Sequence, residues 1–308
     1  MDLIVKTYKI TDLPEIDQIT KVYLKPKFLA LLIKYFNLDV KYLVVKNLHT
    51  QDMVAVTVSV EKKILGIASL INPHQLYYQP IQIFSAIRKC PNENQLQNIE
   101  IYKKISEYFH RFYFRVEKNL SPDNDDIRGF LWSGISAKPL YTYRFNLKSY
   151  TSDNYFNRQR GGLRKAQKMN YSFSRVPDID SFLRLFEGTK QRQDWNYKMD
   201  ETIFHKYLNE LLELGFIEQF SILNQNNEVI STMFCIMDKD NKIFYGWITS
   251  TLTSELTNGV STLLIHSICE HLKKDYDIFD LCGANTDSIA RFKASLGAEL
   301  KVFYRIQL

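Results

Sequence analysis

The segment 277–306, near the end of the chain, constrains the fold more than any other stretch, because it reads as one complete structural unit. Residues 277–281 mix acidic and apolar side chains, as a strand entering a core does. A short helix follows, capped by Asp287 or Ser288 and stopped by Gly297 in a left-handed conformation. Its inward-facing residues are Ile289, Phe292 and Leu296. A final strand completes the pattern.

This strand, helix and strand resemble the closing segment of the GNAT acyltransferase fold, and more narrowly that of FemAB/FemX-like and related tandem-GNAT enzymes. The matching positions are Phe279, Asp280, Gly283, Phe292, Lys293, Gly297 and Tyr304. The resemblance implies a mixed α+β fold made of two tandem GNAT-like (acyl-CoA N-acyltransferase) domains. It also implies transfer of an acyl group onto an amine.

The chain has 308 residues, enough for two domains that each bury a core. A boundary is expected near residue 150, because residues 141–147 alternate as a strand and the following stretch is polar and rich in turn residues. By the resemblance, residues 1–150 form a degenerate GNAT-like domain on the acceptor side. Residues 151–308 form a GNAT-like domain with the donor site.

The second half has the element order of that fold. Apolar residues recur at helical spacing over 179–186 and 203–212, with Asp200 as a cap and Gly215 as a stop for the second helix. Turn-rich segments separate three strand candidates, 216–223, 229–237 and 242–250. An amphipathic helix over 261–272 comes next, before the closing segment.

The first half follows the same plan more loosely. Residues 53–60 and 62–71 read as hairpin strands, a helix is expected around 96–109, and strands are expected at 111–117 and 140–147. The connection from Ile71 to Glu93 contains no glycine, so close backbone approach to a donor is not expected there. The resemblance to FemX-like enzymes implies that the first domain contributes acceptor binding, and the missing glycine fits that division.

GNAT enzymes bind the donor pyrophosphate with backbone amides at the start of the central helix. Gly259 and the small Ser261 match that loop, while Leu256 stands where Gln or Arg is usual. Glycine admits the anion, and the helix start offers unpaired N–H groups. The expected cofactor-binding residues are Asn258, Gly259, Val260, Ser261 and Thr262, together with Phe292. The alternative is a turn glycine before an ordinary Ser or Thr cap.

Lys293 stands four residues before Gly297, where single-domain GNAT enzymes commonly carry a tyrosine that protonates the departing thiolate. An ammonium there can donate a proton, or stabilise an oxyanion or a phosphate, and the alternative is a solvent-facing lysine. Tyr245 is the second catalytic candidate and is expected to line the acyl channel with Trp247. Candidates for the base, by residue type alone, are Asp194, Glu218, Glu228 and Asp280.

Acceptor binding is assigned to Trp195 and Tyr197, which lie in the loop between the first two helices, and to Trp247. Arg160 and Arg164 belong to a basic cluster that is expected to be helical after its glycine pair, exposing a helix start to an anion. They could bind phosphates of a nucleotide-linked acceptor or of tRNA. A solvated linker helix is the alternative.

Other classes lack support. The sequence contains no GxxxxGK[ST], GxGxxG, GxSxG or HExxH motif, and its four cysteines lack metal-ligand spacing, so no metal is expected. The start of the chain does not read as a secretory signal, and the longest early apolar run is broken by charges, so no membrane span is expected. The net charge of +6 permits an anionic substrate. The apolar neighbours of the four cysteines indicate buried free thiols, so a reduced, cytoplasmic setting is expected.

Three hypotheses remain open. The first is N-acylation by acetyl-CoA or another acyl-CoA of a small-molecule, nucleotide-linked or lipid-linked amine. An amino sugar of a polysaccharide or cell-envelope precursor is one such acceptor, and DNA is not an expected partner. The second is a FemX-like ligase that uses aminoacyl-tRNA on a cell-wall precursor. The third is a non-catalytic binding protein, because the usual Gln or Arg and the tyrosine are missing.

Overall fold

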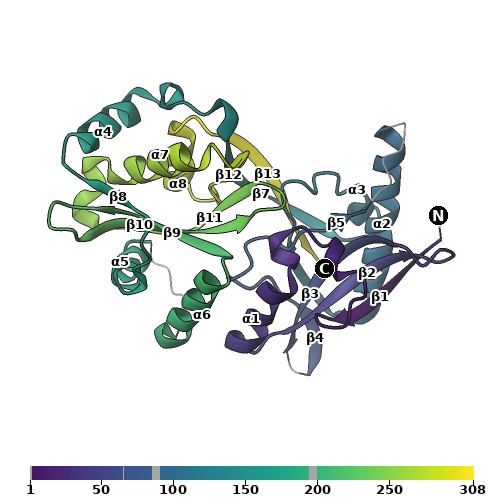
Figure 1. Ribbon diagram of the computed structural model, residues 1–308. Helices are drawn as coiled ribbons and strands as arrows, with labels where there is room; N and C mark the ends of the chain where they lie inside the picture. Colours follow the sequence, from purple (N-terminus) through teal and green to yellow (C-terminus); the bar gives the residue numbers. More distant parts are fainter. Residues whose placement is uncertain (1, 65, 85–90, 194–199) are drawn as a thin grey trace. The chain divides into compact units, whose positions relative to one another are not determined.

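The chain folds into two compact units (Figure 1). One contains Met1–Tyr141 and Val302–Leu308, and the other contains Thr142–Lys301. The division falls after Tyr141 instead of near residue 150, because two strands, β7 (Ser136–Asn146) and β13 (Glu299–Gln307), each pass from one unit into the other. The computed structural model describes residues 2–64, 66–84, 91–193 and 200–308.

The first unit is built on a mixed sheet in the order β1-β2-β3-β4-β6-β13, with β5 beside β3. Its strands pair antiparallel, except that β4 and β6 run parallel. The elements are β1 (Leu3–Lys9), α1 (Pro26–Phe36), β2 (Asp39–Asn47), β3 (Met53–Ile64), β4 (Ile67–Leu70), β5 (Gln82–Ile83), α2 (Pro91–Phe112), β6 (Arg115–Asn119), α3 (Arg128–Leu131), β7 (Ser136–Asn146) and the end of β13 (Glu299–Gln307).

Helix α2 supplies much of the core of this unit. Its buried residues Ile101, Ile105 and Phe109 pack with Val116 of β6 and with Ile306 of β13. The apolar run of the early sequence forms α1 and β2. In the described part of the chain, no helix is both long enough and apolar enough to cross a bilayer.

The segment that follows β4 lies beside β6 beyond the point where β4 ends. The parallel pairing ends at Leu70↔Val116, and the following segment is hydrogen-bonded to β6 instead. The backbone N–H of Gln79 donates to the carbonyl of Asn119 at 2.7 Å. The backbone N–H of Asn119 donates to Oδ1 of Asn72 at 2.9 Å. The place beside β6 that β4 leaves, the strand gap of this unit, is therefore filled by the segment after β4, which contains no glycine.

Lys118 on β6 is buried within the first unit, with 1% of its surface exposed. Its ammonium donates to the carbonyl of Val58 at 2.7 Å and to Oε1 of Gln79 at 3.4 Å. Burial lowers the pKa of Lys118 from 10.5 to about 7, because the charged form loses its water.

We expect stability to depend on pH through Lys118. The unfolded lysine holds its proton up to pH 10.5 and the folded one loses it near pH 7, so unfolding takes up a proton between these values and stability rises with pH. Relative to Lys118→Met, the wild-type protein should gain about 2–3 kcal/mol of unfolding free energy from about pH 6 to pH 9. Urea unfolding of both proteins measures this gain. If the unfolding free energies of the two proteins changed equally with pH, Lys118 would have an ordinary pKa.

The second unit has a mixed sheet in the order β7-β12-β11-β10-β9-β8. The pairs are antiparallel except for β11 with β12. After the end of β7, the elements are α4 (Asn157–Gln167), β8 (Ser172–Ser174), α5 (Ile179–Arg192), α6 (Glu201–Glu213), β9 (Ile217–Leu223), β10 (Val229–Asp238), β11 (Ile243–Thr251), α7 (Val260–Leu272), β12 (Ile278–Asp280), α8 (Asp287–Ser295) and the start of β13.

Helices cover both faces of this sheet. Helices α5 and α6 lie on one face, and α4, α7 and α8 lie on the other (Figure 1). The expected limits of α6 are confirmed: the side chain of Asp200 accepts from the N–H of Ile203 at 3.0 Å, and Gly215 has a φ of 67°. The expected cap of α8 is wrong, because Thr286 is its N-cap residue and no side chain caps it.

Candidate functional site

Strands β11 and β12 part within the second unit. They pair over only three positions, the last being Tyr245↔Asp280, after which β11 continues along β10. At Gly246, just beyond the last pair, an added Cβ would lie 3.2 Å from Sδ of Met233 and 3.3 Å from the ring of Phe279. The absence of a side chain lets Met233 and Phe279 pack against the backbone of β11 here. The gap at the carboxyl end of the parallel pair is the candidate site.

The two aromatic residues expected beside this gap differ in exposure. Tyr245 is buried, with 1% of its surface exposed. Trp247 is partly exposed, and its ring centroid lies 6.2 Å from those of Phe204 and Tyr207 on α6. Trp195 and Tyr197, the other expected acceptor residues, lie outside the described residues.

Helix α7 begins after Gly259, whose φ is 78°, and its first turn contacts the end of β11 through Ser261 and Thr251. No side chain caps this helix start. Asn258 donates to Oε2 of Glu255 at 2.8 Å, and the hydroxyls of Ser261 and Thr251 lie 3.1 Å apart. An uncapped helix start carries free N–H groups and the positive end of the helix dipole, which suits an anion.

Helix α4 packs against this same helix start. A Cβ on Gly259 would lie 2.3 Å from the carbonyl oxygen of Gly162, so the two backbones touch. Thr262 donates to Oε1 of Gln159 at 2.7 Å. The glycine pair was expected to precede a helix and expose its start; instead α4 begins at Asn157 and the glycines lie in its interior. The steric constraint at this contact falls on Gly259, because a Cβ on Gly162 would meet nothing nearer than the Cα of Gly259, at 3.6 Å, and a Cβ on Gly161 would meet nothing within 4 Å.

The exposed face of α4 is basic. Arg160 and Arg164 are both exposed, and Arg160 bonds to Asn157 and to the carbonyl of Asp153. Lys165 reaches the carbonyl of Thr257, just before α7, at 3.3 Å. The other exposed cations of this segment are Arg158 and Lys168. The sequence of α4 contains no acid, so it presents a single sign of charge beside the start of α7.

Lys293 is not a solvent-facing lysine. Its ammonium donates to the carbonyl oxygens of Leu281 at 2.7 Å and Cys282 at 2.6 Å, and to that of Gly283. Burial lowers the pKa of Lys293 to about 8, and the nearby Cys282 and Asp280 oppose this shift by favouring the charged form. The adjacent Phe292 is partly buried against the core of the unit.

The loop that Lys293 holds has an uncommon backbone. Cys282 and Gly283 have φ values of 47° and 74°, both left-handed. For a residue with a Cβ, such as Cys282, this conformation costs roughly 1–2 kcal/mol. The surrounding contacts must therefore hold it.

Asp280, a base candidate in the sequence, belongs to a buried ion pair. It is fully buried, its Oδ2 accepts from Nε of Arg144 at 2.8 Å, and its Oδ1 accepts from Thr142 at 2.6 Å. Sequence reasoning missed Arg144. A charged residue inside the otherwise apolar alternation of β7 was the available signal, because a buried charge needs a partner. Of the other candidates, Glu218 pairs with Arg175 at 3.1 Å and Glu228 bonds to Asn224, while Asp194 lies outside the described residues.

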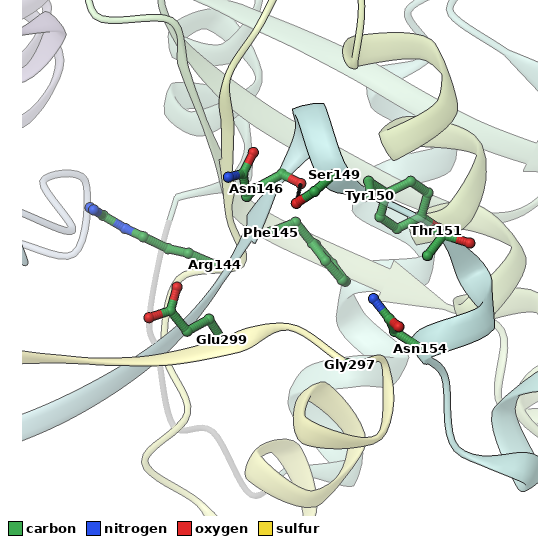
Figure 2. Close-up of a pocket in the computed structure, with 9 residues that line it drawn as sticks. All are labelled: Arg144, Phe145, Asn146, Ser149, Tyr150, Thr151, Asn154, Gly297 and Glu299. Atoms are coloured by element: carbon green, nitrogen blue, oxygen red, sulfur yellow. Dashed lines mark hydrogen bonds between the residues drawn. The ribbon is translucent and has the colours of Figure 1, made fainter.

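A separate cavity of about 260 Å³ lies at the end of β7 (Figure 2). Figure 2 shows Phe145 near the centre of these residues, with Tyr150 above and Gly297 below it in the view. The hydroxyl of Tyr150 lies 2.9 Å from Nδ1 of His266. No residue predicted as catalytic, cofactor-binding or substrate-binding lines this cavity. The lining residues are Arg144, Phe145, Asn146, Ser149, Tyr150, Thr151, Asn154, Gly297 and Glu299.

The order of the strands, with helices on both faces and a parting parallel pair, is that of the GNAT fold. The two units together have a tandem GNAT, FemX-like fold.

The assignment of this fold rests on similarity to solved structures. FemX is 12% identical, with 90% of each chain covered and a TM-score of 0.62. The C-terminal DUF2156 domain of a putative lysylphosphatidylglycerol synthetase from Agrobacterium fabrum is 11% identical, covering 95% of this chain and 89% of that one, with a TM-score of 0.57. A tandem GNAT protein from the clavulanic acid biosynthesis pathway is 8% identical, covering 99% and 98%, with a TM-score of 0.55. No family model and no curated protein matches the sequence. At these identities the likeness shows the fold alone.

Proposed function

We propose that the protein is an N-acyltransferase that moves an acyl group from acyl-CoA to an amine. The observation that carries this proposal is the meeting of two features: the parting of β11 from β12 and the uncapped start of α7. Backbone amides from Gly259 to Thr262 would hold the donor pyrophosphate, with Asn258 beside them. The acyl group would reach the gap near Tyr245, with Trp247 and Phe292 flanking it.

The transfer needs no covalent enzyme intermediate. The amine nitrogen attacks the thioester carbonyl, the C–S bond breaks, and CoA leaves as a thiolate that takes up a proton. The amine gives its proton to a base, through water where necessary. Orientation of the two substrates supplies most of the rate.

The first unit would bind the acceptor and the second unit the donor. In the first unit the segment between β4 and β6 occupies the strand gap, which supports an acceptor role and a donor site in the second unit. The acceptor class is a small-molecule, nucleotide-linked or lipid-linked amine, such as an amino sugar of an envelope precursor. The buried free thiols of Cys235, Cys269 and Cys282 are in keeping with a cytoplasmic setting.

A second candidate keeps the fold and changes the donor to aminoacyl-tRNA. The basic face of α4 favours it, since exposed cations without acids suit a phosphate backbone. The contact of Gly162 with Gly259 also narrows the approach of a CoA pyrophosphate to α7.

Binding measurements separate the two donors. Titration with acetyl-CoA and with charged tRNA, each at several salt concentrations, should give saturable binding of acetyl-CoA if the first proposal is right. Binding of charged tRNA alone, with a steep salt dependence, would favour the second candidate. Binding of neither would leave a protein that has the fold without this activity.

The double substitution Arg160→Ala/Arg164→Ala tests the role of α4. If tRNA is the donor, its affinity should fall about tenfold or more and its salt dependence should flatten, because two phosphate contacts are lost. Acetyl-CoA binding should change by less than about threefold, since helix amides hold its pyrophosphate. Lys273→Ala/Lys274→Ala removes the same charge at the far end of α7 and is the matched control. Equal losses in both double variants would contradict a specific role for α4.

A further inference from the structure

The loop after β12 is held from one side by a single ammonium. An ammonium has three N–H donors and no acceptor. In Lys293 these donors face the carbonyls of Leu281, Cys282 and Gly283. Every proton of the ammonium thus has a backbone partner in this arrangement, and none is left for a departing group.

The same loop is held from the other side by a carboxylate. The N–H of Cys282 donates to Oδ1 of Asp280 at 2.9 Å, and the N–H of Leu281 donates to the carbonyl of Tyr143 at 2.9 Å. A cation on the carbonyls and an anion on an amide match the partial charges of the peptide groups. Together they hold two successive left-handed residues that an unsupported chain would leave.

The loop that Lys293 contacts lies directly after β12, where β12 and β11 part. It starts directly after Asp280, the last residue of β12 that pairs with β11. The backbone that follows Asp280 is therefore one wall of the gap. A change in its course would change the width of the gap.

We propose that Lys293 is a positioning residue, which clamps the loop from Leu281 to Gly283 and so fixes the wall of the donor gap. It acts through backbone carbonyls and not on the acyl group. This inference rests on the proposed function, because that proposal places the donor in the gap.

The test removes the ammonium and then returns it. Lys293→Ala deletes three carbons and the ammonium, a space that n-propylammonium fills. Hydrogen exchange is followed at the Leu281 and Cys282 amides, and acetyl-CoA affinity is measured in parallel. Arg291→Ala is the matched control, because Arg291 lies on the same helix, exposed and paired with Asp287.

In Lys293→Ala we expect the two amides to exchange about tenfold faster or more, and acetyl-CoA to bind about tenfold more weakly or worse. Propylammonium should restore both and 1-propanol neither, because the clamp needs the charge. Arg291→Ala should match the wild-type protein. A merely structural lysine would not show recovery of acetyl-CoA binding with a free amine.

Unchanged exchange in Lys293→Ala overturns the clamp. Faster exchange with unchanged acetyl-CoA affinity overturns its positioning role. Should the alanine variant not fold, Lys293→Gln decides, since its amide offers two donors: intermediate exchange supports the clamp, and wild-type exchange overturns it. A wild-type protein that binds no acetyl-CoA refutes the proposed donor, and the exchange measurement alone then decides the clamp.

Discussion

Replacing Arg144 by Met is expected to lower the free energy of unfolding by about 3–5 kcal/mol, because it removes the guanidinium that pairs with the buried carboxylate of Asp280. The two side chains are 8% and 0% exposed, and their ion pair measures 2.8 Å. Methionine keeps most of the volume of the arginine stem, so loss of packing contributes little. Chemical denaturation of the two proteins, compared at one pH, measures the change.

Lys148→Met is the control for Arg144→Met. Lys148 follows the same strand and pairs with Asp277 at 3.1 Å, but the two side chains are 70% and 38% exposed. Water screens such a pair, so its loss should cost no more than about 0.5 kcal/mol. Similar losses in both variants would show that the pair of Arg144 with Asp280 is not a desolvated one.

Gly259→Ala should destabilise the protein by about 3 kcal/mol. A left-handed residue with a Cβ costs roughly 1–2 kcal/mol, and forcing apart a packed contact adds roughly 1–3 kcal/mol. Both apply here, because φ is 78° and the new Cβ would lie 2.3 Å from the carbonyl oxygen of Gly162. The midpoint of urea unfolding measures the loss.

Gly162→Ala tests the same contact from the opposite side. A Cβ on Gly162 would have the Cα of Gly259 as its nearest neighbour, at 3.6 Å, which is an ordinary contact distance. Since alanine favours a helix interior over glycine by roughly 0.5–1 kcal/mol, stability should stay level or rise by that amount. A loss as large as that in Gly259→Ala would contradict this packing of α4 on α7.

Local patterns were enough to predict several regular elements of the second unit, among them α6 and α7. Apolar spacing placed α7 at 261–272, and the structure has Val260–Leu272. Asp200 and Gly215 marked the limits of α6 because their roles depend on neighbouring backbone groups alone. Such interactions span a few residues, which makes them visible in a sequence.

Helix α4 was predicted in part, because its start depends on a distant contact. Two adjacent glycines each disfavour a helix interior by roughly 1 kcal/mol, so a helix beginning after Gly162 was the reasonable expectation. In the structure the helix runs through both glycines, and Gly259, 97 positions later in the chain, approaches Gly162. Nothing in the local sequence signals that approach.

The candidate site, too, was predicted only in part from the sequence. The sequence by itself determined the element order of the second half, the glycine at the start of α7, and the place of Lys293 before Gly297, because spacing along the chain carries each of them. Only the tertiary structure decided that Lys293 holds three carbonyls and that Asp280 pairs with Arg144. Those partners are brought together by the folded sheet, and the free energy of a buried charge depends on what the fold places around it.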